Sequence, residues 1–167
     1  VNGASKAFAM TGWRIGFAAG PQEIISAMAR VQSHATSNAC SVSQAAAVAA
    51  FAGPQDEIHR MAAEFCRRRD FLHQRVAAWP EVTCIKPEGA FYLFPNVRAL
   101  YDLVYEGAPI GGSLRMAQFL LTEAEVAIVP GEAFGADDFI RLSYATSMEN
   151  LEKAADRIEA AIENLRG

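Results

Sequence analysis

Residues 5–17 have the sequence SKAFAMTGWRIGF, and this stretch decides how the rest of the chain is interpreted. Lys6 and Arg14 are its only charged residues, and they stand among small, apolar and aromatic side chains. Burying a lone cation costs free energy unless an anion meets it. No acidic residue precedes Glu23 in the sequence, so the neighbouring chain offers these cations no partner. An anion from elsewhere is therefore needed to pair with Lys6 and Arg14.

The composition is that of a globular protein. The chain has 167 residues, of which 51% are hydrophobic and 20% charged, which is enough apolar surface for a core. Its formal net charge of −4 argues against nucleic acid or an anionic membrane as a partner. The three cysteines are dispersed without a CxxC pair, which favours reduced thiols in the cytoplasm. The histidines have no metal-ligand spacing, so we expect no metal site.

The N-terminal part of the chain predicts short strands followed by helices. Residues 1–20 are rich in glycine, alanine and aromatic side chains, which indicates strands joined by tight turns, with Trp13 and Phe17 in the core. Gly20-Pro21 predicts the start of a helix. The apolar face of that helix is formed by Ile24, Met28 and Val31.

Two further helices are expected before residue 80. A polar loop precedes an alanine-rich helix that ends near Phe51, with Ser41 or Ser43 as its N-cap. After Gly53-Pro54, apolar residues at helical spacing predict a long amphipathic helix to about Trp79. We place a domain boundary inside or beside this long helix.

The pattern changes after Pro80, where strands and helices alternate. We expect strands at residues 82–86, 91–94, 126–129 and 139–144, a helix over 113–121, and a final helix capped by Ser147. This order predicts a small α+β domain in which helices cover one face of a mainly antiparallel sheet.

A third cation, Arg141, also stands in a strand-like apolar stretch. For a single such residue, exposure to solvent or a carboxylate partner is the ordinary explanation. The three cations Lys6, Arg14 and Arg141, taken together, favour binding of an anionic ligand that is not part of the chain. Two arginines can each hold a planar or tetrahedral anion with two hydrogen bonds, and a lysine amine provides Schiff-base chemistry. A phosphate bound at one arginine, a carboxylate bound at the other and a lysine amine between them are the features of a pyridoxal-phosphate site.

These residues also resemble a known family. The SKAFAMTGWRIGF stretch is similar to the cofactor-lysine segment of the class I/II aminotransferases, which are fold type I pyridoxal-phosphate enzymes, and most of all to the bacterial aspartate aminotransferase subgroup. Further stretches resemble the family in the same order along the chain: SNACSVSQAA at 37–46, PEGAFYLFP at 87–95, VAIVPGEAFG at 126–135 and IRLSYATSMENL at 140–151.

The resemblance implies a role for each matching residue. Lys6 corresponds to the catalytic lysine that binds the cofactor covalently and then moves a proton between substrate and cofactor. Arg14 corresponds to the arginine that binds the cofactor phosphate, and Arg141 to the arginine that binds the substrate α-carboxylate. Asn38 lies in a loop that is near the dimer interface in relatives, and Phe134 is expected to wall the substrate pocket.

The resemblance also implies a fold and a division of the chain. The expected class is α/β, the C-terminal part of a fold type I transferase. Residues 1–54 would be the tail of the large cofactor-binding domain and residues 55–167 the small α+β domain. We interpret the chain as a fragment, because it starts inside an expected strand. The family's aspartate that pairs with the pyridine nitrogen lies upstream of the lysine, so little activity is expected of the chain alone.

The implied function is transfer of an amino group from aspartate, or a related acidic or aromatic amino acid, to a 2-oxo acid. The whole protein is expected to act in amino-acid metabolism as a cytoplasmic homodimer, without a nucleic-acid or membrane partner. Two alternatives stay open: a carbon–sulfur β-lyase or aminocyclopropane-carboxylate-synthase-like enzyme of the same fold, and a non-catalytic relative.

Overall fold

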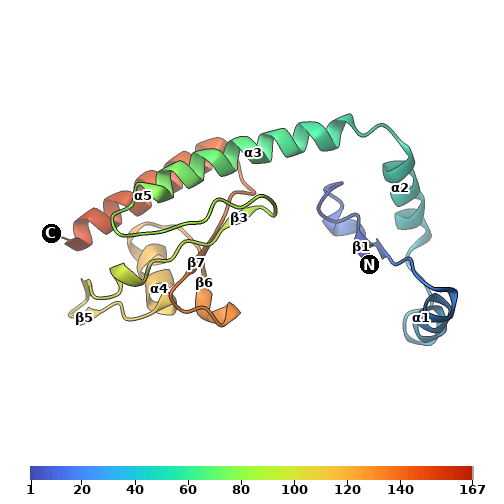
Figure 1. Cartoon of the computed structure of the whole chain (residues 1–167), viewed down its shortest axis with the longest axis horizontal. Coiled ribbons are helices and arrows are strands. Elements are labelled where there is room, and N and C mark those ends of the chain that lie inside the picture. The colour runs from blue at the N-terminus through green and yellow to red at the C-terminus, as the bar shows by residue number, and fades with distance from the viewer. Residues whose placement is uncertain (167) are drawn as a thin grey trace. The chain divides into compact units, whose positions relative to one another are not determined.

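A computed structural model describes residues 1–166 (Figure 1). The chain divides into two compact units, unit 1 (Val1–Met61) and unit 2 (Ala62–Gly167). The division falls inside helix α3 (Asp56–Ala77), a few residues after the boundary expected from the sequence. The assignment of residues 1–54 and 55–167 to the two domains of a larger enzyme stays a prediction.

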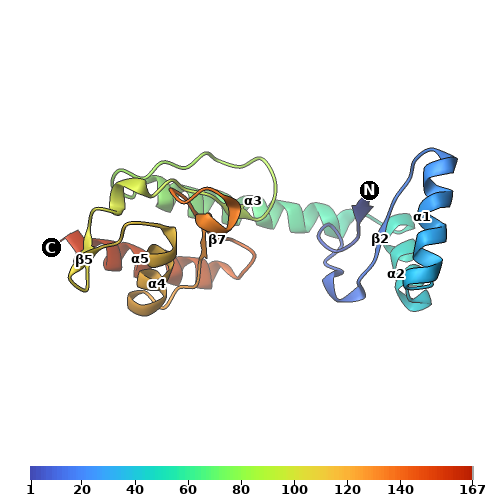
Figure 2. The ribbon, with the colours of Figure 1, turned by 90° about the horizontal axis from the view of Figure 1, so that it is seen from below.

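Unit 1 consists of a small β-ribbon and two helices. Strand β1 (Asn2–Gly3) pairs antiparallel with β2 (Gly16–Phe17), and the 3-10 helix η1 (Thr11–Trp13) lies between them. Helices α1 (Gln22–Ala35) and α2 (Ser41–Ala52) follow, and their axes run at a steep angle to each other (Figures 1 and 2). The short strands and both helices confirm the sequence prediction for this region.

Few side chains of unit 1 are buried. The buried ones are Ala4, Met10, Ser43 and Ala47. Helix α1 has no buried residue, so its predicted apolar face is exposed. Trp13 and Phe17 are 45% and 48% exposed, so the prediction that they lie in the core is wrong for this chain. The reason is that unit 1 has no second layer against which these faces can pack.

The sheet of unit 2 has three antiparallel strands with β7 in the middle. Strand β7 (Ile140–Ser143) pairs with β3 (Tyr92–Leu93) on one side and with β6 (Val129–Pro130) on the other. The antiparallel sheet is confirmed. The strand expected at 82–86 is wrong, because only Thr83 bridges to the sheet region, through Asn96.

A separate hairpin and two helices complete unit 2. Strands β4 (Val104–Tyr105) and β5 (Ala108–Pro109) form the hairpin, and α4 (Ser113–Glu123) and α5 (Met148–Arg166) are the helices. The N-cap prediction for α5 is confirmed, because the Asn150 N–H donates to Ser147 Oγ at 3.2 Å.

One hydrophobic core joins the sheet of unit 2 to its helices. On β7, buried Ile140 and Leu142 alternate with the more exposed Arg141 and Ser143. The buried side chains share a cluster with residues of three helices: Leu72 and Val76 from α3, Met116, Phe119 and Leu120 from α4, and Leu151, Ile158 and Ile162 from α5. The helices therefore cover one face of the sheet, and Arg141 lies on the other.

Helices α3 and α5 lie side by side within unit 2 (Figures 1 and 2). The Arg75 guanidinium of α3 donates to Asp156 Oδ1 at 2.7 Å and to Glu159 Oε1 at 2.9 Å, both on α5. Among residues 1–166, no helix is long and apolar enough to cross a membrane. The same part of the chain contains no group of His, Cys, Asp and Glu side chains placed to hold a metal ion.

Candidate active site

Lys6 lies in a tight turn at the surface of unit 1. The turn is fixed by backbone hydrogen bonds from Phe8 N–H to the Ala4 carbonyl at 3.2 Å and from Met10 N–H to the Ser5 carbonyl at 3.1 Å. Ala4 and Met10 are 1% and 7% exposed, so they fasten both ends of the turn to unit 1. The side chain of Lys6 between them is exposed. Lys6 thus belongs to an anchored turn and not to a strand.

Arg14 follows η1 in a left-handed backbone conformation, with φ 49° and ψ 51°. Such a conformation is uncommon outside glycine and persists only when its surroundings hold it. The Arg14 Nη1 donates to the Thr11 carbonyl at 3.0 Å, and the Ser43 hydroxyl donates to the Trp13 carbonyl at 2.8 Å. The buried Ser43 of α2 therefore fixes the turn that presents Arg14.

This use of Ser43 corrects a sequence prediction. Helix α2 begins at Ser41, and its N-cap residue is Cys40, whose side chain makes no capping hydrogen bond. The predicted N-cap, Ser41 or Ser43, is therefore wrong. Ser43 instead connects two segments that are 30 residues apart in sequence.

The chemistry of Lys6 and Arg14 fits a ligand with an aldehyde and a phosphate. Both side chains are exposed on the same segment of unit 1, and within residues 1–166 no carboxylate forms an ion pair with Arg14. A primary amine reacts with an aldehyde, and a guanidinium forms paired hydrogen bonds with a phosphate. Pyridoxal phosphate has both groups.

Asn38 lies beside the end of the 5–17 stretch and shares no hollow with Lys6 or Arg14. It is exposed, and its Nδ2 donates to the Ala39 carbonyl at 3.1 Å. It lines a largely apolar hollow of about 790 Å³ in unit 1, together with Phe17 and Phe51. Neither Lys6 nor Arg14 lines this hollow.

Arg141 and Phe134 lie together in unit 2. The Arg141 Cζ is 4.8 Å from the centre of the Phe134 ring and 5.3 Å from the centre of the Tyr92 ring. These distances are within the range of a cation–π interaction. Within residues 1–166, the guanidinium has no carboxylate in ion-pair contact, so its N–H edge is available for an anion. The arrangement can bind a carboxylate on the face of the sheet away from the core.

Further aromatic rings pack against Phe134, next to Arg141. Phe94 stacks on Phe139 with ring centres 5.0 Å apart and an interplanar angle of 9°. Phe134 meets Phe94 edge-on, with ring centres 6.0 Å apart. We call Tyr92, Phe94, Phe134 and Phe139 the aromatic cluster. It gives Arg141 an apolar border, which strengthens an electrostatic interaction with a bound anion.

The loop that carries Phe134 is fastened by a buried hydroxyl. Ser113, which is fully buried, donates from its hydroxyl to Asp137 Oδ1 at 2.7 Å and from its N–H to the same oxygen at 2.9 Å. The hydroxyl also accepts from the Glu132 N–H at 3.0 Å. The hydroxyl bond first, and the N–H bond second, lower the pKa of Asp137. Residues 132 and 137, on both sides of Phe134, are thus fixed to the start of α4.

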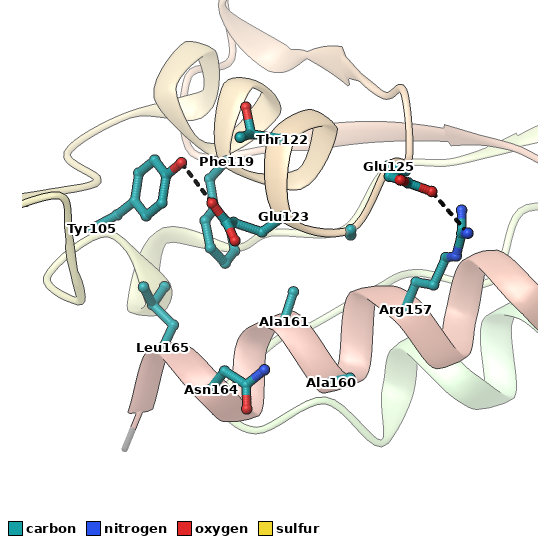
Figure 3. Close-up of a pocket in the computed structure, with 11 residues that line it drawn as sticks. Tyr105, Phe119, Thr122, Glu123, Glu125, Arg157, Ala160, Ala161, Asn164 and Leu165 are labelled. Atoms are coloured by element: carbon teal, nitrogen blue, oxygen red, sulfur yellow. Dashed lines mark hydrogen bonds and ion pairs between the residues drawn. The ribbon is translucent and has the colours of Figure 1, made fainter.

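A separate cavity of about 550 Å³ lies between the end of α4 and α5 (Figure 3). Two polar pairs border it: Tyr105 donates to Glu123 Oε1 at 2.9 Å, and Arg157 pairs with Glu125 Oε2 at 2.8 Å. None of the site residues predicted from the sequence lines it.

Tyr92 and the Ser113–Asp137 pair were not predicted from the sequence as parts of the site. A signal for Tyr92 was present, because Tyr92 and Phe94 are two residues apart in an expected strand and therefore share a face. The Ser113–Asp137 pair joins positions 24 residues apart, and no local pattern marks it.

Comparison with known proteins identifies the family of the chain. The chain is 48% identical over 166 residues to an aspartate aminotransferase of Geobacillus stearothermophilus, covering 98% of this chain and 40% of that protein. The crystal structure of the aspartate aminotransferase from Rhizobium meliloti matches with a TM-score of 0.92 and 48% identity, over 96% of this chain and 40% of that one.

A more distant match has a different activity in its name. The crystal structure of an aromatic aminotransferase from Pyrococcus horikoshii has a TM-score of 0.87 and 36% identity, over 98% of this chain and 42% of that one. The chain thus spans about two fifths of the length of its relatives. The sequence model of the family described as aminotransferase class I and II matches residues 1–158. The chain belongs to the class I and II aminotransferases.

Proposed function

We propose that the protein is a pyridoxal-phosphate-dependent aminotransferase, which passes an amino group from an amino acid to a 2-oxo acid. One observation carries the proposal: the chain is 48% identical to an aspartate aminotransferase over 98% of its length. The resemblance of the segments around Lys6, Arg14 and Arg141 to the family's lysine and arginine segments supports it. Because the chain spans about two fifths of its relatives, the proposal concerns the whole protein.

Each residue has a defined part in the proposed reaction. When bound, pyridoxal phosphate supplies an aldehyde and a conjugated ring that withdraws electrons from the substrate Cα. Arg14 would hold the cofactor phosphate, and the Lys6 amine would hold the cofactor aldehyde. With substrate bound, the Lys6 amine would accept the proton from the substrate Cα. Arg141 binds the substrate α-carboxylate, Phe134 walls the pocket, and Asn38 contributes to the substrate site.

The proposed substrates are aspartate and related acidic or aromatic amino acids. The names of the Geobacillus and Pyrococcus relatives, an aspartate and an aromatic aminotransferase, support this range. We further propose a cytoplasmic homodimer. The dispersed cysteines support the compartment, and the resemblance of residues 37–46 to a loop at the family's dimer interface supports the assembly.

Cofactor trapping tests the proposal directly. The chain has three lysines, Lys6, Lys86 and Lys153. After incubation with pyridoxal phosphate and reduction with borohydride, peptide mass spectrometry should find the label at Lys6. The Lys6→Ala variant is the matched control and should stay unlabelled. Lys86 is engaged with Asp70 at 2.9 Å, so equal labelling of all three lysines would contradict a built site.

A 2-oxo acid distinguishes the aminotransferase from its alternatives. An aminotransferase needs the 2-oxo acid to recover the aldehyde form of its cofactor, whereas a β-lyase turns over without it. We expect the whole protein to depend on the 2-oxo acid and the 167-residue chain to turn over little by itself. Sustained turnover without a 2-oxo acid would favour the β-lyase.

A further inference from the structure

Tyr92 faces Arg141 because of the register of the sheet. In the β3–β7 pair, Tyr92 lies opposite Ser143 and Leu93 lies opposite Leu142. Side chains two residues apart on a strand share a face, so Arg141 is on the same face as Ser143 and is the diagonal neighbour of Tyr92. Diagonal neighbours are close enough for aromatic and long side chains to meet.

We propose that the Tyr92 ring is a positioning element for Arg141, which it holds together with Phe134 in place of an acidic partner. The proposal rests on the proposed role of Arg141 in carboxylate binding. The Arg141 Cζ lies 5.3 Å from the Tyr92 ring centre and 4.8 Å from the Phe134 ring centre. Within residues 1–166, no carboxylate replaces these two contacts.

A ring contact leaves the N–H donors of a guanidinium free to bind an anion, whereas a carboxylate partner occupies them. An arginine presents its N–H donors at the edge of a planar group, while a ring contacts the face. Arg75, in contrast, donates to both Asp156 and Glu159 and has its edge occupied. An acid at Arg141 would compete with the substrate for the same donors, whereas a ring restricts the side chain without competing.

The contact depends on the ring of Tyr92 and not on its hydroxyl. Within the described residues, the Tyr92 hydroxyl makes no hydrogen bond. Phenylalanine at this position should therefore preserve the function, and an aliphatic side chain should not. This distinguishes positioning by the ring from acid–base chemistry by a tyrosine hydroxyl and from simple filling of space.

The first measurement is the NMR spectrum of the 167-residue chain, with the Arg141 side-chain signals assigned by comparison with Arg141→Lys. Protons above a ring face are shifted upfield, so we expect an upfield shift of the Arg141 Hδ and Hε signals. The shift should persist in Tyr92→Phe and shrink in Tyr92→Leu. Unshifted Arg141 signals in the unaltered chain would overturn the proposal without any variant.

The second measurement is a titration with L-aspartate, followed at the Arg141 Nε–Hε signal. We expect the affinity to fall about two- to fivefold in Tyr92→Leu and to be unchanged in Tyr92→Phe. Tyr105→Leu is a matched control, because it removes another tyrosine of unit 2 whose ring packs on an arginine, Arg115, at 6.0 Å. Circular dichroism melting shows whether each variant is folded.

The outcomes separate the two proposals. Equal losses in Tyr92→Phe and Tyr92→Leu, or no loss in a folded Tyr92→Leu, would overturn positioning by the ring. If aspartate leaves the Arg141 signal unmoved while the ring shift is present and shrinks in Tyr92→Leu, the positioning role stands. The proposed carboxylate role of Arg141 would then be the part that fails.

Discussion

At the scale of single residues, two arginines of unit 2 are held in different ways. Arg75 meets two carboxylates of α5, and the same Glu159 also accepts from the Trp79 Nε1 at 3.3 Å. Arg141 meets only ring faces within residues 1–166. The first arrangement satisfies the guanidinium and joins two helices. The second leaves the guanidinium able to bind a ligand, which is the difference expected between a structural and a functional arginine.

Asp137 makes the stability of unit 2 dependent on pH. The bonds from Ser113 lower its pKa in the folded state. A lowered carboxylate pKa contributes stability above the unfolded-state value of about 4, and this contribution is lost as the pH falls through the folded-state value. We therefore expect the urea midpoint to fall between pH 5 and pH 3, by less in Asp137→Asn than in the unaltered chain.

Asparagine is the suitable substitution at this position, because its carbonyl still accepts both Ser113 bonds but does not titrate. Asp102→Asn is the control, since Asp102 is exposed and its nearest cation, Arg98, is 4.0 Å away. An identical acid response in Asp137→Asn and in the unaltered chain would show that Asp137 does not contribute to the pH dependence.

At the scale of elements, the 131–138 loop is held in shape by a glycine that no other residue can replace. A Cβ at Gly131 would lie 2.1 Å from the Ala136 carbonyl oxygen and 2.3 Å from that of Phe139. Both are backbone atoms that already accept hydrogen bonds within the loop: Phe139 N–H donates to the Ala136 carbonyl at 3.0 Å, and Gly131 N–H donates to the Phe139 carbonyl at 2.9 Å. The close backbone approach therefore shapes the loop that carries Phe134.

Gly131→Ala should therefore destabilise unit 2 by at least about 2 kcal/mol, because the backbone must shift to admit the methyl group. It should also move Phe134 away from Arg141 and reduce the upfield shift of the Arg141 protons. Gly89→Ala is the matched control, since a Cβ there has no atom within 4 Å. Urea unfolding of both variants measures the difference, and equal stability of the two would contradict this account of the loop.

At the scale of the whole molecule, the two units differ in what holds them together. Unit 2 has a continuous core of twenty buried side chains drawn from its sheet and helices. Unit 1 buries only Ala4, Met10, Ser43 and Ala47 and exposes large apolar side chains, among them Val31, Val48 and Phe17. Burial of apolar surface is the main favourable contribution to folding, so the free energy of local opening must be smaller in unit 1.

Hydrogen exchange should reveal this difference. In the 167-residue chain, we expect amides of α1 and α2 to exchange much faster than those of α4 and α5, as measured on peptides by mass spectrometry. Equal protection of α2 and α5 would show that unit 1 is stabilised by contacts other than the buried side chains.

Local patterns predicted most of the elements and the family. Periodicity located the helices that became α1 to α5, and the alternation in residues 139–144 marked the central strand, because both signals depend on neighbouring residues alone. The prediction of a strand at 82–86 is wrong, because a strand forms only where a partner strand lies alongside it. In this stretch, Thr83 alone pairs with another segment, at Asn96. The prediction that Trp13 and Phe17 are buried is wrong for a related reason. Hydrophobicity favours burial, but burial needs a second layer that covers the side chain.

The sequence by itself determined the family and led to the prediction of Lys6, Arg14 and Arg141 as site residues, because both depend on residue types at fixed spacing. Only the tertiary structure decided what surrounds them. Ser43 reaches back to the turn of Arg14, Ser113 fastens the loop of Phe134, and Tyr92 meets Arg141 across a strand pair. Each of these contacts joins residues far apart in the chain, and only packing brings such residues together.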